Sequence, residues 1–163
     1  MRSLPGKTRE EETLNVHARL VPYAVTAGAF GLDRLLKEWA LQALSGGGSF
    51  PVWPGILHWT LVHNTGAAFG LWPDGADLLT VFSAASALLI LGYLRRPVPN
   101  AIAWSLVASG ALGNLYDRLR FGYVVDFIDL RVWPVFNFAD SCICVGVAWI
   151  VWRAFWPRPV RTA

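Results

Sequence analysis

The stretch VFNFADSCICVGVAWIVW, Val135–Trp152, decides the fold because it combines a long apolar run with one carboxylate. Residues 141–152 carry no charge, which is typical of a helix that crosses a membrane. Asp140 stands immediately before this run, and inserting a carboxylate into a bilayer costs roughly 2.5–3.5 kcal/mol. A carboxylate that is kept at this cost is a candidate functional residue.

Three more uncharged stretches precede it, at residues 20–32, 78–94 and 97–116. A membrane-crossing helix needs about 20 apolar residues, with a lower limit near 17. The second and third stretches reach this limit alone, and the first reaches it if Asp33 lies within the helix. We therefore expect a membrane all-α protein with a four-transmembrane-helix bundle. Its helices are predicted at residues 20–44, 75–94, 99–117 and 137–156.

The composition favours a single membrane domain over a soluble one, because 55% of the 163 residues are hydrophobic and only 15% are charged. We assign residues 20–156 to this domain. The polar segment 1–19 lacks the features of a signal peptide, so we interpret it as a cytoplasmic tail, and we interpret residues 157–163 as a second one.

The segment VWPGILHWTLVHNTGAAFGLW, residues 52–72, alternates in polarity and is rich in Trp, Val and Thr, which predicts short strands. Unpaired strands cannot face lipid, so this segment must lie outside the membrane against the helices. We expect a small extracytoplasmic β-cradle there. Residues between Asp126 and Asp140 are predicted to form a short outer loop, with Asp126 on it.

The basic residues predict the orientation of the chain. The net charge of +3 is small and no basic run is interleaved with aromatic residues, so a nucleic-acid partner is not expected. Residues 45–77 contain no Lys or Arg. The positive-inside rule then puts both termini in the cytoplasm and the strands outside. The flanking basic residues are Arg2, Lys7, Arg9, Arg19, Arg95, Arg96, Arg153, Arg158 and Arg161.

Several acids have purely structural interpretations when each is taken alone. Asp33 and Lys37 are four residues apart with the acid first, the favourable order for an ion pair on a helix. Asn137 and Asp140 have the spacing of a helix N-cap with its capping-box acid. Asp117 stands near a predicted helix end, where its side chain can satisfy backbone groups.

The combination of Asp126 and Asp140 with nearby Asn and Arg residues favours a catalytic interpretation. Two neighbouring carboxylates cannot both ionise cheaply, so one keeps a proton while the other acts as a base. Such a pair can activate water and protonate a leaving amine, which is aspartic-peptidase chemistry. Two alternatives remain: a metal-dependent membrane lipid phosphotransferase, because Asp clusters bind Mg²⁺, and a proton-coupled transporter.

Four motifs resemble those of the lipoprotein signal peptidases, also called signal peptidase II: DRLLK (33–37), NTGAAFG (64–70), GALGNLYDRLRFGYVVDFIDL (110–130) and FNFAD (136–140). The resemblance implies an aspartic endopeptidase of the bacterial cytoplasmic membrane, with its active site near the outer face. It would remove the signal peptide from prolipoproteins that bear a diacylglyceryl-Cys, cutting just before that Cys. No metal or other cofactor is implied, membrane lipid is the surrounding partner, and we expect a monomer.

The resemblance also implies roles for individual residues. The catalytic pair would be Asp126 and Asp140. The residues that bind substrate and orient the pair would be Asn64, Asn114, Arg118 and Asn137. Structural support would come from Asp33, Lys37, Gly66 and Asp117, with Asp117 paired to an arginine.

The chain departs from the family pattern at three places. Leu36 stands where the family usually has a hydroxyl residue, and Ser109 replaces a common Gly. The link from Asp126 to Asp140 is also shorter than in many members. Since that loop helps to cover the substrate, the short link is expected to affect how the substrate is covered, while the acid pair stays the same.

Overall fold

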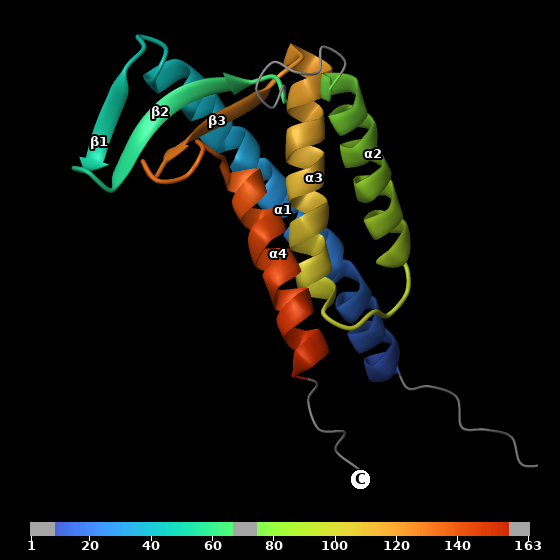
Figure 1. Cartoon of the computed structure of the whole chain (residues 1–163). Coiled ribbons are helices and arrows are strands. Elements are labelled where there is room, and N and C mark those ends of the chain that lie inside the picture. Colours follow the sequence, from blue (N-terminus) through green and yellow to red (C-terminus); the bar gives the residue numbers. More distant parts are fainter. Residues whose placement is uncertain (1–8, 67–74, 157–163) are drawn as a thin grey trace, which may run out of the picture.

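The computed structural model describes residues 9–66 and 75–156, with side chains from residue 19 onward in the first range and from residue 78 onward in the second. The predicted C-terminal tail and residues 67–70 of the NTGAAFG motif lie outside the described part, as do residues 1–8. Within it, four helices form a bundle with a three-stranded sheet at one end (Figure 1). The elements are α1 (Arg9–Ala43), β1 (Ser49–Trp53), β2 (Leu57–Asn64), α2 (Gly75–Tyr93), α3 (Ala101–Phe121), β3 (Val124–Asp129) and α4 (Phe138–Phe155).

Two helices match their predicted ranges closely and two are longer. α2 and α4 agree with prediction to within one residue at each end. α1 begins at Arg9, eleven residues before the predicted start, so residues 9–19, which were predicted to precede the first helix, are helical. Glu and Leu in this segment are strong helix formers, which the charge-based boundary did not consider. α3 continues to Phe121 and ends at Gly122, whose left-handed φ of 77° stops the helix.

Helix α3 is the centre of the bundle and contacts the other three helices (Figure 1). Glycines allow the close approach of α3 and α4. A Cβ on Gly146 would stand 2.6 Å from the Ala103 carbonyl oxygen, and one on Gly110 would clash with the carbonyl oxygen of Ala139. The two backbones therefore pack against each other with no side chain between them, as in many membrane helix pairs.

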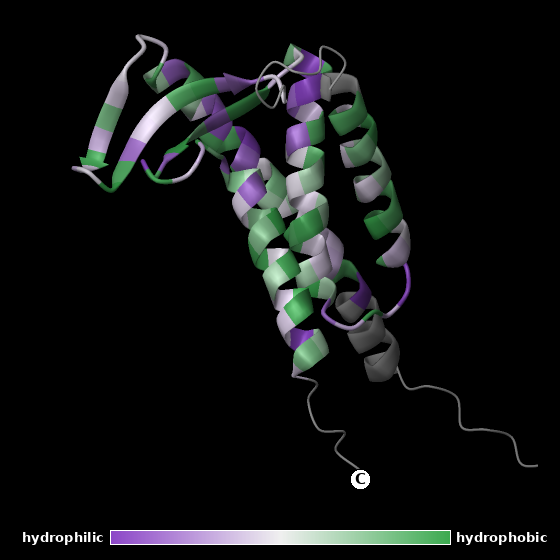
Figure 2. Ribbon diagram, viewed as in Figure 1, coloured by the Kyte–Doolittle hydropathy of each residue, from purple (hydrophilic) through white to green (hydrophobic). Residues whose placement is uncertain are grey.

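The outer surface of the bundle is apolar, while hydrophilic residues gather toward the sheet (Figure 2). On α2, Leu78, Phe82, Leu88 and Leu89 are each at least 69% exposed. Such an apolar exterior is suited to lipid contact. Among the described helices, Phe138–Phe155 is long and apolar enough to cross a membrane by composition, and a shorter apolar run covers Leu78–Tyr93. The predicted number of four crossings therefore stays a prediction.

The sheet is antiparallel in the order β1-β2-β3, and it confirms the expected strands of the β-cradle. The segment that contains Asp126 was expected in a loop, but it forms strand β3 and pairs with β2, with Asp126 opposite Val62. Phe127 on β3 is buried and packs against Trp39 of α1 and Trp59 of β2, at ring distances of 6.2 and 6.0 Å. This aromatic cluster fixes β3 to the end of the bundle.

Candidate active site

The first turn of α4 carries Asp140 in a complete capping box, as the spacing predicted. The Asn137 side-chain oxygen accepts a hydrogen bond from the Asp140 N–H at 2.9 Å, and the Asn137 N–H donates to Asp140 Oδ2 at 3.2 Å. These bonds hold the half-buried Asp140 carboxylate at the helix N-terminus, where the helix dipole interacts favourably with negative charge.

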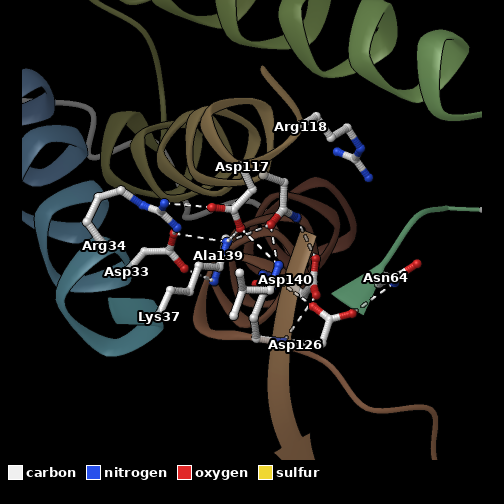
Figure 3. Close-up of polar contacts among 12 residues, drawn as sticks. Asp33, Arg34, Lys37, Asn64, Asp117, Arg118, Asp126, Ala139 and Asp140 are labelled. Atoms are coloured by element: carbon white, nitrogen blue, oxygen red, sulfur yellow. Dashed lines mark hydrogen bonds and ion pairs between the residues drawn. The ribbon is translucent and has the colours of Figure 1, made fainter. Parts of the chain in front are cut away.

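Asn137 also links Asp140 to Asp126, which is 1% exposed. Its side-chain amide donates to Asp126 Oδ1 at 2.6 Å, while the amide of Asn64 donates to Asp126 Oδ2 at 2.8 Å (Figure 3). Both oxygens of Asp126 are therefore held by amides from different elements. The two predicted catalytic acids, Asp126 and Asp140, thus share Asn137 as a common partner.

The pKa of Asp126 is raised to about 6, chiefly by burial. The negative charge of Asp140 also contributes to this rise, whereas the hydrogen bonds from Asn64 and Asn137 and the charge of Lys37 partly offset it. An acid with a pKa near neutrality can hold a proton while a neighbouring carboxylate is ionised. The site therefore has a specific group suited to proton donation.

Asn114 of α3 extends the network from Asp140 toward α1. Its side-chain amide donates to Asp140 Oδ1 at 2.7 Å. Its side-chain oxygen accepts hydrogen bonds from Lys37 Nζ at 3.0 Å and from the Asn137 amide at 3.2 Å. Because its donor and acceptor atoms are both engaged, Asn114 has one orientation in this network.

A buried ionic cluster lies behind Asn114 and joins α1 to α3. Lys37 Nζ is 3.1 Å from Asp33 Oδ2 and 2.8 Å from Asp117 Oδ2, and Arg34 contacts the same two acids at 3.1 and 2.6 Å. The predicted Asp33–Lys37 ion pair and the predicted pairing of Asp117 with an arginine are both confirmed. Two cations balance two anions, which is necessary because Lys37, Asp33 and Asp117 are at most 1% exposed.

The same acids hold the elements that carry the candidate catalytic residues. Asp33 Oδ1 accepts a hydrogen bond from the N–H of Ala139 in α4 at 3.0 Å, and Asp117 Oδ2 accepts one from the N–H of Val125 in β3 at 3.1 Å. Ala139 directly precedes Asp140, and Val125 directly precedes Asp126. The ionic cluster therefore fixes both acids through their backbones. Arg34 was not among the predicted site residues, although it lies inside the DRLLK motif.

Two predicted site residues have more distant roles in the structure. Arg118 donates to the Ser83 hydroxyl of α2 at 3.0 Å and makes no hydrogen bond to either acid, although both acids interact with its charge. Gly66 has a left-handed φ of 74°, and a Cβ there would stand 2.5 Å from Leu79 Cδ1. Its N–H donates to Asn64 Oδ1 at 2.9 Å, which turns the Asn64 amide nitrogen toward Asp126.

A pocket of about 260 Å³ opens beside Asp140. Apolar side chains form most of its wall, so it can receive an apolar group next to the carboxylate. The pocket is lined by Leu130, Trp133, Phe136, Asp140, Ser141 and Cys144.

Within the described part of the chain, no group of three or more His, Cys, Asp or Glu side chains is arranged to hold a metal ion.

Solved structures identify the class of protein that has this fold. Two structures described as bacterial membrane enzymes, determined by the in meso method at 2.3 and 1.9 Å resolution, superpose with TM-scores of 0.74 and 0.76. Their sequences are 26% and 28% identical to this chain. The superpositions cover 88% and 85% of this chain, respectively, and 94% of each of the two solved structures. The fold is therefore that of bacterial membrane enzymes.

The sequence comparisons identify the family. Residues 25–156 match the family model described as signal peptidase (SPase) II. The lipoprotein signal peptidase of Moorella thermoacetica is 42% identical over 130 residues, which cover 77% of this chain and 87% of that protein. The one from Halothermothrix orenii is 40% identical over 132 residues, covering 79% and 91%. The chain therefore belongs to the signal peptidase II family, an aspartic peptidase family, as its motifs predicted.

Proposed function

We propose that this protein removes the signal peptide from diacylglyceryl-modified prolipoproteins by cutting the bond before the lipidated Cys, and that Asp126 and Asp140 form its catalytic pair. The observation that carries the proposal is the shared contact of both acids with Asn137. It supports a pair held as one unit at the polar end of an apolar bundle. Relatives named lipoprotein signal peptidase support the substrate class.

In the proposed mechanism the two acids share one proton, which we place on Asp126 because the pKa of Asp126 is raised to about 6, chiefly by burial. Asp140 takes a proton from water, and the water oxygen attacks the scissile carbonyl carbon. Asp126 gives its proton to the carbonyl oxygen, which produces a neutral tetrahedral intermediate. The intermediate then returns a hydroxyl proton to Asp126 while Asp140 protonates the leaving nitrogen and the C–N bond breaks. Both acids end in their starting states.

The remaining predicted residues hold the pair and the substrate in this proposal. Asn64 and Asn137 orient Asp126, and Asn114 orients Asp140. Arg118 is half-exposed and interacts electrostatically with both acids, so its guanidinium can bind a substrate carbonyl. The pocket beside Asp140 can receive an apolar group of the substrate.

We also propose that the four helices cross the bacterial cytoplasmic membrane with both termini in the cytoplasm and the acids near the outer face. The apolar exterior of α2 supports this arrangement, and its 19 residues span about 28 Å, close to the thickness of the hydrocarbon core. The acyl chains of the substrate then stay in the bilayer during cleavage. We expect a monomer that needs no metal or other cofactor, with residues 20–156 as its catalytic domain.

The first experiment compares the wild type with Asp126→Asn and Asp140→Asn in a gel-shift cleavage assay in detergent. The substrate is a prolipoprotein supplied with and without its diacylglyceryl group, and a chelator is present throughout. We expect cleavage of the lipidated form alone, reduced at least about 10³-fold in each variant. Asp129→Asn is the matched control, because Asp129 lies on the same strand but pairs with Thr60 and Arg131.

Three outcomes would contradict the proposal. Substantial cleavage by either Asn variant would remove that residue from the pair. An inactive wild type that becomes active when the chelator is omitted would indicate a metal-dependent reaction, as expected of the phosphotransferase. Substrate flux across vesicles without a cleaved product would favour the proton-coupled transporter.

A further inference from the structure

A second pocket, of about 400 Å³, lies at the opposite end of the bundle from the acid pair. It forms where α1, the α2–α3 connection and the first residue of α3 come together. Two arginines, one from α1 and one from the connection, stand on its wall, and the rest of the wall is apolar. The residues that matter here are Arg19, Arg96, Pro22, Leu94, Val98 and Ala101.

Among the side chains that the structure describes, none balances the positive charge in this pocket. The described residues that line it include no acid, and neither Arg19 nor Arg96 makes an ion pair or side-chain hydrogen bond with any of the described side chains. Arg34, by contrast, contacts two acids. The nearest acids before Arg19 along α1 are Glu10–Glu12, at least seven residues or about 10 Å away along the helix axis. The pocket is therefore a cationic site with room for an anion.

Aromatic and apolar neighbours indicate the depth of this pocket in a membrane. Tyr93, which ends α2, packs edge-on against Trp104 of α3 at a ring distance of 5.5 Å and is 43% exposed. Tyr and Trp gather at the level of lipid headgroups. Leu20 and Val21, next to Arg19, are about half exposed and can contact acyl chains. A lipid phosphate would therefore lie at the same depth as the two arginines.

We propose that this pocket binds the phosphate of an anionic phospholipid of the inner leaflet. Arg19 and Arg96 donate hydrogen bonds to the phosphate oxygens, while the exposed side chains of Leu20 and Val21 contact the upper acyl chains. A basic pocket between membrane helices on the cytoplasmic side is suited to anionic headgroups. The proposal rests on the membrane orientation given above and is independent of the peptidase activity.

The test measures lipid retention by native mass spectrometry on the full chain in detergent. Dioleoyl phosphatidylglycerol is titrated against dioleoyl phosphatidylcholine, which has the same chains and no net charge. We expect preferential retention of phosphatidylglycerol by the wild type. Arg19→Gln and Arg96→Gln should each weaken it about fivefold, the effect of one basic residue near an anionic lipid. Arg95→Gln is the matched control, because Arg95 neighbours Arg96 and is also exposed but does not line the pocket.

Each of the other outcomes would overturn the proposal. Equal retention of the two lipids by the wild type would show that the pocket does not select for charge. An equal loss in Arg95→Gln would indicate diffuse attraction to the whole basic end. Displacement of phosphatidylglycerol by millimolar inorganic phosphate would indicate a site for a soluble anion. Prolipoprotein cleavage, assayed on the same samples, separates these results from the outcome for the peptidase.

Discussion

Asn137 has two functions that a single substitution can separate, namely capping α4 and donating to Asp126. Asn137→Ser keeps a good N-cap but removes the amide that donates to Asp126 Oδ1 at 2.6 Å. A hydrogen bond to a charged group contributes about 1.5–3 kcal/mol, and 1.36 kcal/mol corresponds to a tenfold change in proton affinity. The pKa of Asp126, about 6 in the wild type, should therefore rise to between about 7 and 8 in the variant.

The direction of the change in activity follows from the proposed role of Asp126 as the proton donor. Wild-type cleavage should fall as the pH rises through the pKa of Asp126, because the donor loses its proton. In Asn137→Ser this alkaline limb should move upward by one to two pH units, while the maximal rate falls because Asp126 is held less firmly. The assay is the initial rate of cleavage of a lipidated prolipoprotein in detergent between about pH 5 and pH 9.

Asn137→Ala is the matched control because it removes the donor and the cap together. Its pH profile should resemble that of Asn137→Ser, but its free energy of unfolding should be about 1 kcal/mol lower than that of Asn137→Ser. Thermal unfolding in detergent measures this difference. An alkaline limb that stays in place in both variants, or moves to lower pH, would refute the assignment of the proton to Asp126.

Two further substitutions test the packing behind the site. Gly113→Ala puts a Cβ 2.5 Å from Asp33 Oδ2, so it should lower the rate of cleavage and reduce the free energy of unfolding by about 1–3 kcal/mol. Gly28→Ala is the control: a Cβ there meets nothing within 4 Å, so this change should stabilise α1 slightly. Equal effects of the two substitutions in thermal unfolding would contradict this packing. Leu36→Thr should destabilise the protein by about 1–2 kcal/mol, because Leu36 packs against the cluster that contains Phe127, while the cleavage rate changes little. A large gain in rate would mean that position 36 has a direct role in catalysis.

Contacts between residues close in sequence could be predicted from the sequence. The spacing of three between Asn137 and Asp140 predicted the capping box, and the spacing of four between Asp33 and Lys37 predicted their ion pair. Both patterns depend only on helix geometry. The ranges of α2 and α4 could be predicted for a similar reason, because the length of an uncharged run between charged flanks gives the length of the helix without any knowledge of its neighbours.

Contacts between distant residues could not be predicted in this way. Asp117 was expected to pair with an arginine, but its partner Arg34 is 83 residues away and no local pattern selects it. Strand β3 was missed because most of its residues are buried on both faces, which removes the alternation typical of a half-buried strand. The motifs predicted Asp126 and Asp140 as partners, because a family resemblance carries information about tertiary contacts that periodicity lacks, and in the structure both acids contact Asn137.

The hydrogen bond from the N–H of Ala139 to the carboxylate of Asp33 joins residues that are 106 positions apart in the chain and are therefore synthesised at different times. Asp33 emerges early, with α1, whereas the N–H that donates to it belongs to α4, the last of the described helices to be synthesised. Until α4 enters the bundle, Asp33 lacks this donor, and Asp140 has not yet reached Asn114. Asp126 and Asp140 therefore come together only after α4 has joined the bundle, so a chain that stops before α4 would carry no complete acid pair.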